Sequence, residues 1–137
     1  MPEIRGVGSH TTWFEEPDLI GLRLAGDVSL QESEELAREH FGMAQGRDAI
    51  FMLVDMAGYG SGTPAGRKVT SEALYRMPVH GIALYRAKLT SKVMAKLVFA
   101  GVKLFRKDRQ GLPIEFFADE TEARTWIEAK RSAGKRG

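Results

Sequence analysis

The sequence predicts a single α/β domain of order ββαβαβαβα, with a mostly parallel five-stranded sheet, an antiparallel edge hairpin and helical cover. The run AIFMLVDM (49–56) is apolar without alternation, which is typical of a strand buried on both faces of a parallel sheet. Helix-capping signals alternate with short apolar runs along the chain, as they do in βαβ units. A length of 137 residues fits one such domain.

The first third of the chain indicates a β-hairpin after a loose start. Residues 1–9 are expected to form a flexible leader, and residues 10–131 the folded domain. HTTWFEE (10–16) carries the strand formers Thr, Trp and Phe, and Pro-Asp (17–18) then predicts a turn. LIGLRLAG (19–26) follows with alternating apolar residues, so the two segments are interpreted as paired strands.

Two local signals predict the first two helices. Ser29 and Glu32 have the spacing of a capping box, in which the hydroxyl and the carboxylate each accept a backbone N–H. Thr63 is a good N-cap, and Pro64 then occupies the first helical position, where its missing N–H has no cost. Helices are therefore expected to follow both positions.

The second half of the chain continues the alternation. Pro78 ends the second helix, and VHGIALY (79–85) is predicted as the fourth strand. Thr90 is expected to cap a long helix over 91–107, and IEFFA (114–118) to form the fifth strand. A last helix follows with Asp119 and Glu122 at the capping-box spacing and a buried stripe of Ala123, Trp126 and Ile127. Residues 132–137 are expected to be a basic tail.

Charge is distributed unevenly along a chain of net charge +2. Residues 1–66 carry a net −7, residues 67–137 a net +9, and the segment 86–109 alone a net +7. Such a chain can present a basic face to an acidic protein, an anionic membrane, nucleic acid or a second copy of itself. The alternative, that the two halves lie side by side and compensate each other locally, stays open at this point.

The residue types that support catalysis are sparse. The chain has no cysteine, and His10, His40 and His80 lack a second ligand-type residue at metal-binding spacing. A triad of Ser61, His80 and Asp55 can be drawn, but the GxSxG pattern of a nucleophile elbow is missing. We therefore expect no enzymatic activity, no catalytic residue, no cofactor and no metal. Without a signal-peptide core or a membrane-spanning apolar run, the sequence predicts a cytoplasmic protein.

The glycine-rich segment DMAGYGSGTPAGRK (55–68) is the strongest candidate for a binding site. It follows a central strand and opens a helix, which is where parallel sheets bind ligands and where helix N-termini attract anions. It lacks the GxxxxGK[ST] pattern of a P-loop, and its GxGxxA match is weak. A plain strand-to-helix turn is the structural alternative. The candidate ligand or phosphorylation-switch residues are Asp55, Gly58, Gly60, Ser61, Gly62 and Thr63.

The element order resembles the STAS domain, the fold of anti-sigma-factor antagonists, and its relatives in the CRAL-TRIO lipid-binding class. The likeness covers about residues 9–131 and rests on four segments: AIFMLVDM, the strand after Pro78, VMAKLVFAGVKLF and IEFFADETEARTWI. In antagonists the resemblance implies a D-S/T-S-G motif whose serine a kinase phosphorylates. Here Met56 follows Asp55, and the nearby hydroxyls are those of Ser61 and Thr63. Relatives that lack the motif are therefore the closer likeness.

The predicted helix 91–107 carries a basic stripe. At about 100° per residue, five cations fall within an arc of about 100°, and Phe99 falls among them. These six residues, Lys92, Lys96, Phe99, Lys103, Arg106 and Lys107, are the candidate surface for a membrane or a protein partner. The alternative is a core helix with a solvated lysine face. Nucleic acid is disfavoured because the aromatic residues do not alternate with the cations as in a stacking platform.

These observations lead to one main hypothesis and one alternative. The main hypothesis is a non-enzymatic STAS-like regulatory or ligand-binding domain, which uses the segment 55–67 to bind a regulatory protein or a small anionic or apolar ligand. The alternative is a peripheral lipid-binding or lipid-carrying module that uses the basic helix on anionic lipid, with peripheral attachment to a membrane. Homodimerisation stays open in both.

Overall fold

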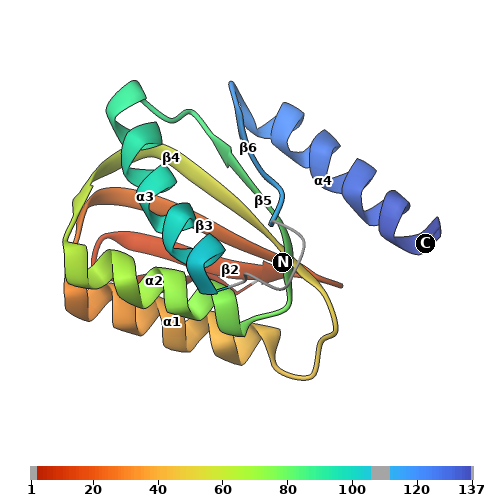
Figure 1. Cartoon of the computed structure of the whole chain (residues 1–137), viewed down its shortest axis with the longest axis horizontal. Helices are drawn as coiled ribbons and strands as arrows, with labels where there is room; N and C mark the ends of the chain where they lie inside the picture. Colours follow the sequence, from red (N-terminus) through yellow and green to blue (C-terminus); the bar gives the residue numbers. More distant parts are fainter. Residues whose placement is uncertain (1–2, 106–111, 137) are drawn as a thin grey trace.

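The protein folds as one six-stranded sheet with helices on both faces (Figure 1). The computed structural model describes the backbone of residues 3–105 and 112–136, and their side chains outside positions 94, 99, 101–105 and 134–136. The strands are β1 (Arg5–Val7), β2 (His10–Glu15), β3 (Leu19–Val28), β4 (Ile50–Gly62), β5 (Val79–Tyr85) and β6 (Ile114–Phe117). The helices are α1 (Leu30–Ala44), α2 (Pro64–Arg76), α3 (Leu89–Phe105) and α4 (Glu120–Arg136).

The strands lie in the sheet in the order in which they occur in the chain. β1, β2 and β3 are antiparallel neighbours, and β3, β4, β5 and β6 are parallel neighbours. Because each parallel strand is added on the same side of the previous one, successive right-handed crossovers place their helices on one face. α1, α2 and α3 accordingly cover one face, and α4 lies alone on the other (Figure 1). We call these the three-helix face and the α4 face.

Each face of the sheet has its own apolar core. Alternation along the buried strand β4 sends Ile50, Met52 and Val54 to the three-helix face, and Phe51 and Leu53 to the α4 face. This division explains why β4 is continuously apolar from Ile50 to Val54: both of its sides are covered there.

The predicted mixed α/β class and the mostly parallel sheet are confirmed, with six strands rather than five. The additional strand β1 pairs with β2 and lies in the segment expected to be a leader. Three residues of strand are too short to produce a recognisable alternation in the sequence. At the other end, α4 continues to Arg136, so the backbone of the expected basic tail is helical as far as that residue.

The capping predictions for the first two helices are confirmed. Ser29 and Glu32 form both reciprocal bonds of a capping box, and Thr63 accepts a hydrogen bond from the Gly66 N–H with Pro64 at the start of the helix. The prediction for the third helix is wrong at its start, because α3 begins at Leu89 and Thr90 lies inside it.

Candidate functional site

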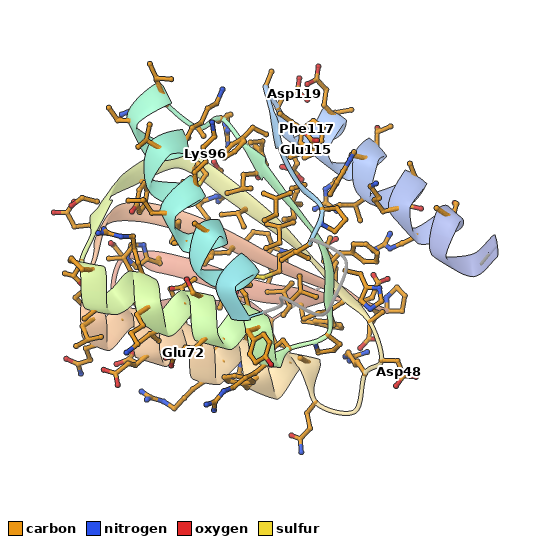
Figure 2. The ribbon with its side chains drawn as sticks, in the orientation of Figure 1. Asp48, Glu72, Lys96, Glu115, Phe117 and Asp119 are labelled. Carbon is orange, nitrogen blue, oxygen red and sulfur yellow. The ribbon has the colours of Figure 1, made fainter. Side chains whose placement is uncertain are left out.

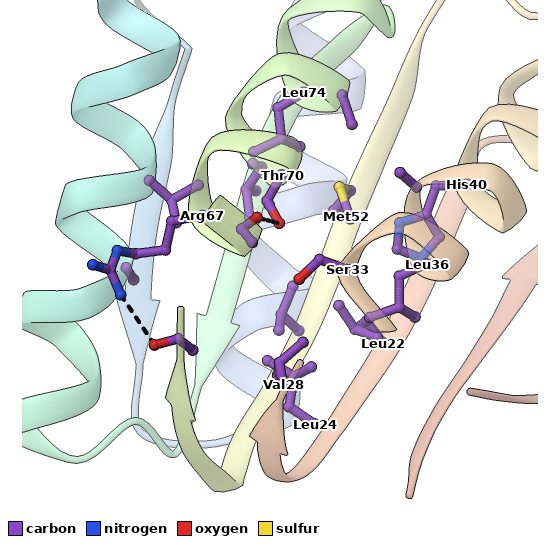
Figure 3. Close-up of a pocket in the computed structure, with 18 of the residues that line it drawn as sticks. Leu22, Leu24, Val28, Ser33, Leu36, His40, Met52, Arg67, Thr70 and Leu74 are labelled. Atoms are coloured by element: carbon purple, nitrogen blue, oxygen red, sulfur yellow. Dashed lines mark hydrogen bonds between the residues drawn. The ribbon is translucent and has the colours of Figure 1, made fainter. Parts of the chain in front are cut away.

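An apolar cavity of about 150 Å³ lies between the three-helix face of the sheet and the helices (Figure 3). Its floor consists of side chains of β3, β4 and β5, and its walls of side chains of α1, α2 and α3. Leu22, Met52 and Leu84 represent the floor, and Leu36 and Leu74 the walls. Most of the lining is apolar, so the cavity favours an apolar occupant.

The backbone of α2 lies close to its neighbouring helices, α1 and α3, and farther from the strands beneath it. Gly66 allows α2 to approach α1 closely, since a Cβ at that position would lie 2.8 Å from the Ser33 Oγ. On the other side, the Ser71 hydroxyl donates to the Val98 carbonyl of α3 at 2.8 Å. α2 therefore spans the space between α1 and α3 and leaves a void above the sheet.

The cavity reaches the surface where β4 passes into α2. Thr63 is an exposed lining residue, and Tyr59, Gly62 and Arg67 are partly exposed lining residues. Arg67 donates from Nη1 to the Gly62 carbonyl at 3.3 Å, and Figure 3 shows this contact at the edge of the cavity. Burial raises the pKa of Tyr59, so its hydroxyl stays protonated. The guanidinium and the positive end of the α2 dipole contribute positive charge to this rim, and the Asp27 carboxylate near Tyr59 contributes negative charge.

Two buried polar side chains of α1, Ser33 and His40, also line the cavity. Both residues are buried, and Figure 3 shows them among the aliphatic side chains. The His40 Nε2 lies 3.0 Å from the Thr12 hydroxyl, which in turn donates to the Gly21 carbonyl at 2.6 Å. Burial lowers the pKa of His40 to about 4, so its imidazole is neutral at pH 7.

The predicted binding loop is for the most part a strand. β4 continues to Gly62 because β3 continues beside it to Val28, with pairs such as Ala25 with Gly58 and Gly26 with Tyr59. Glycine suits this paired segment of β3 and β4: a Cβ on Gly58 would lie 2.9 Å from the Leu24 carbonyl oxygen, and one on Gly60 would lie 3.1 Å from the Asp27 backbone nitrogen. The glycine-rich composition thus reflects close strand pairing.

Ser61 lies on the exposed edge of this ribbon, next to Asp27. Its backbone N–H and its hydroxyl both donate to Asp27 Oδ1, at 2.9 and 3.1 Å. Of the six predicted loop residues, only Gly62 and Thr63 line the cavity. The role of Ser61 as a phosphorylation switch stays a prediction.

Asp55 belongs to the opposite face of the sheet. It is 3% exposed and accepts hydrogen bonds from Arg23 Nε at 3.3 Å, Arg86 Nη2 at 2.5 Å and the Ala57 N–H at 3.0 Å. Both arginine side chains are about half exposed. Arg86 has a left-handed backbone (φ 57°), a conformation that few non-glycine residues adopt. Asp55 therefore links the middle of β3 and β4 to the residue that follows β5, and it does not meet Ser61 or Thr63 at one site.

The helix that carries the basic stripe presents an apolar edge to solvent. Leu89, Val93 and Leu97, spaced four residues apart on α3, are 79%, 53% and 51% exposed. Lys96 is exposed on the same helix (Figure 2), whereas Lys92 is half-buried with its Nζ 5.8 Å from the centre of the Phe116 ring. The side chains of Phe99 and Lys103, and residues Arg106 and Lys107, lie outside the described part of the protein.

The described residues do not supply two other kinds of site. Within residues 3–105 and 112–136, histidine and carboxylate side chains do not gather in a group of three that could hold a metal ion. In the same ranges, every helix is too short or too polar to cross a bilayer.

Comparison with solved structures gives a match over nearly the whole chain. A DUF3478-family protein from Shewanella loihica, described as having a SpoIIAA-like fold, superposes with a TM-score of 0.60 at 12% identity, covering 92% of this chain and 94% of that one. The chain has a SpoIIAA-like fold. No protein-family model and no curated protein sequence matches it. The STAS half of the predicted resemblance is thus confirmed as a fold, and the comparison gives no support to the CRAL-TRIO relation.

Sequence reasoning missed most of the cavity residues in this SpoIIAA-like fold. Ser33 and His40 lie on α1, which carried no functional prediction. One signal was present: a serine and a histidine seven residues apart fall on the same side of a helix, among leucine and alanine. That spacing marks a polar interruption of a core face, but it does not reveal a void beside it.

Proposed function

We propose that this protein is a non-enzymatic, ligand-binding regulatory domain of SpoIIAA-like fold. Its ligand is a small molecule with an apolar body that fills the cavity and a polar or anionic end at the rim. The observation that carries the proposal is the apolar cavity itself, open beside Thr63 and Arg67.

The size of the cavity defines the class of ligand. A dry cavity of about 150 Å³ lined by aliphatic side chains is large enough to take up benzene or xenon in other proteins. A single ring or a short alkyl chain fits this volume. At the rim, the Arg67 guanidinium and the N-terminal end of α2 favour a carboxylate or a phosphate over a cation.

The regulatory part of the proposal follows from the position of α2. A ligand in the cavity would contact side chains of both α2 and the sheet. Binding would therefore fix α2 over the strands, and a partner protein that recognises α2 could sense it. This step rests on likeness to the STAS-type regulatory fold, which indicates such a role by analogy.

Calorimetric titration of the purified protein with benzene and with hexanoate tests the proposal. Both probes should bind to the wild type, hexanoate more tightly because of its charged end. Ala73 lines the cavity, so Ala73→Leu should fill the void and abolish binding of both. Ala129 is exposed on α4, on the opposite face, and Ala129→Leu is the matched control that should leave binding unchanged. Failure of both probes to bind to the wild type would contradict the proposal.

The exposed edge of α3 supports a second candidate function, attachment to an anionic phospholipid surface. Leu89, Val93 and Leu97 form an apolar stripe, and α3 contains lysines and no acidic residue. Apolar residues flanked by lysine are the pattern of a helix that lies in the membrane interface. The comparison with solved structures does not support this candidate, which rests on the stripe alone.

Co-sedimentation with phosphatidylserine vesicles tests this second candidate. We expect pelleting at low salt, loss of pelleting in Val93→Ser with Leu97→Ser, and weaker pelleting in Lys96→Glu because each lysine near the surface contributes about 1 kcal/mol. Lys68→Glu, on the exposed side of α2, is the charge-matched control. A wild type that stays in the supernatant and sediments as a dimer would assign the stripe to a homodimer contact instead.

A further inference from the structure

The hydrogen bonds around His40 determine which nitrogen of its imidazole carries the proton. The Thr12 hydroxyl has a single proton, which it donates to the Gly21 carbonyl at 2.6 Å. The contact of 3.0 Å between Thr12 Oγ1 and His40 Nε2 therefore requires that Nε2 carries a proton and donates it. A neutral imidazole protonated on Nε2 has a lone pair on Nδ1.

That lone pair has no partner among the described residues. Within residues 3–105 and 112–136, Nε2 makes the only hydrogen bond of the His40 ring, and the residue lines the apolar cavity at 5% exposure. The Ser33 hydroxyl, two turns earlier on α1, is likewise buried in the lining, and the described residues offer its oxygen no hydrogen bond. Buried polar groups are nearly always hydrogen-bonded, so two such groups at one void point to an occupant that supplies the bonds.

The two groups lie at different depths of the cavity. Ser33 is beside Gly66, close to the rim, since a Cβ on Gly66 would nearly touch its hydroxyl. His40 is seven residues further along α1, about 10 Å from Ser33 at 1.5 Å per residue. An occupant that spans the cavity would therefore have the imidazole at its inner end and the Ser33 hydroxyl at its outer end.

We infer that the ligand carries a hydrogen-bond donor on its apolar body, namely a phenolic or alcoholic hydroxyl that donates to the His40 Nδ1. This inference rests on the proposed function and refines it from any small apolar molecule to a small alcohol or phenol. A group without a donor proton, such as an ether, would leave Nδ1 unsatisfied and would be rejected, because sites with a buried polar group discriminate against analogues that do not pair with it.

Titration of the wild type with phenol, anisole and benzene at pH 7 tests the inference. The three probes share a ring, and only phenol has a proton to donate. Phenol should bind at least about tenfold more tightly than anisole. His40→Leu should remove this preference. His80→Leu is the matched control, the same substitution at an exposed histidine outside the cavity lining, and it should retain the preference for phenol.

A second readout keeps the test independent of variant stability. In the unmodified protein, the 15N resonance of the His40 Nδ1 should move upfield when phenol binds and stay in place when benzene binds. Equal affinities for the three probes, with an unmoved Nδ1 resonance, would overturn the inference and leave the proposed function intact. Absence of binding by all three probes, and by hexanoate, would overturn both.

Discussion

The two faces of the sheet are built differently, although the same strands form both. On the α4 face, Ala123 and Ile127 are 0% and 1% exposed against β4 and β5. Two arginines hold the helix to the β2–β3 side of the sheet: Arg124 bonds both oxygens of Glu15 at 2.8 Å, and Arg131 bonds Asp18. On the three-helix face, the middle helix is held by the other helices, and a cavity lies beneath it.

The difference between the two faces follows from the topology of the sheet. Three successive crossovers place three helices on one face. There the central helix, α2, can pack against α1 and α3 beside it as well as against the strands. A single terminal helix has no such support and must pack directly on the strands. We therefore interpret the α4 face as the rigid part of the domain and the three-helix face as the part that can accept a ligand.

The same substitution on the two faces should give the largest difference. Ala123→Leu inserts a large side chain where no space exists, and we expect it to lower the free energy of unfolding by about 3 kcal/mol. Ala73→Leu points into the cavity and should change it by less than about 0.5 kcal/mol, or raise it. Urea denaturation of both variants measures the difference. Equal destabilisation would mean that the two faces are packed alike.

Acid should weaken the two faces in separate pH ranges. The pKa of His40 falls from 6.5 in the unfolded chain to about 4 in the folded protein, because burial disfavours the charged form. The unfolded state therefore binds more protons below pH 6.5, and the free energy of unfolding should fall by about 2 kcal/mol between pH 7 and pH 5. His40→Leu should remove this decrease. A decrease of unchanged size in the variant would show that other groups cause it.

The α4 face should respond only at lower pH. Hydrogen bonds from Arg124 hold the pKa of Glu15 at about 2, below its ordinary value of 4.5. The stabilisation from this ion pair is present above pH 4.5 and is lost as the pH falls toward 2. Comparison of wild type with Arg124→Gln across this range, by thermal unfolding, should show the loss in the wild type alone.

The smallest expected effect concerns the N-cap at the rim of the cavity. Thr63→Ala removes the acceptor of the Gly66 N–H and should cost about 1 kcal/mol, or several degrees in Tm. Ser29→Ala at α1 is the matched cap and should cost a similar amount. With hexanoate bound, Thr63→Ala should also weaken affinity, because that cap lies at the rim, whereas Ser29→Ala should not. Equal affinities in the two variants would argue against a ligand end at Thr63.

Local chemistry made much of the fold predictable from the sequence. The Ser29–Glu32 capping box, the Thr63–Pro64 start of α2 and the apolar run of β4 each depend on residues adjacent in the chain. The buried stripe of Ala123 and Ile127 in α4 was likewise predictable, because a helix with a polar majority can bury only its apolar side.

The candidate site was less predictable because it depends on how elements pack. The wheel of α3 gave the spacing of its apolar residues but not which edge the sheet would cover, and Leu89, Val93 and Leu97 are exposed. Glycines in 58–62 suggested a loop, whereas pairing with β3 makes this segment a strand. The cavity arises from the distance between α2 and the strands, and local residue spacing carries no information about that distance.

A crystal of the protein pressurised with xenon tests most directly whether the three-helix face holds a space for a ligand. Xenon binds in apolar cavities of this size without requiring polar contacts. We expect a xenon atom between Met52, Leu74 and Leu84, and no xenon on the α4 face. A crystal structure in which α2 packs directly on β4 and β5, with no xenon beneath it, would contradict the account.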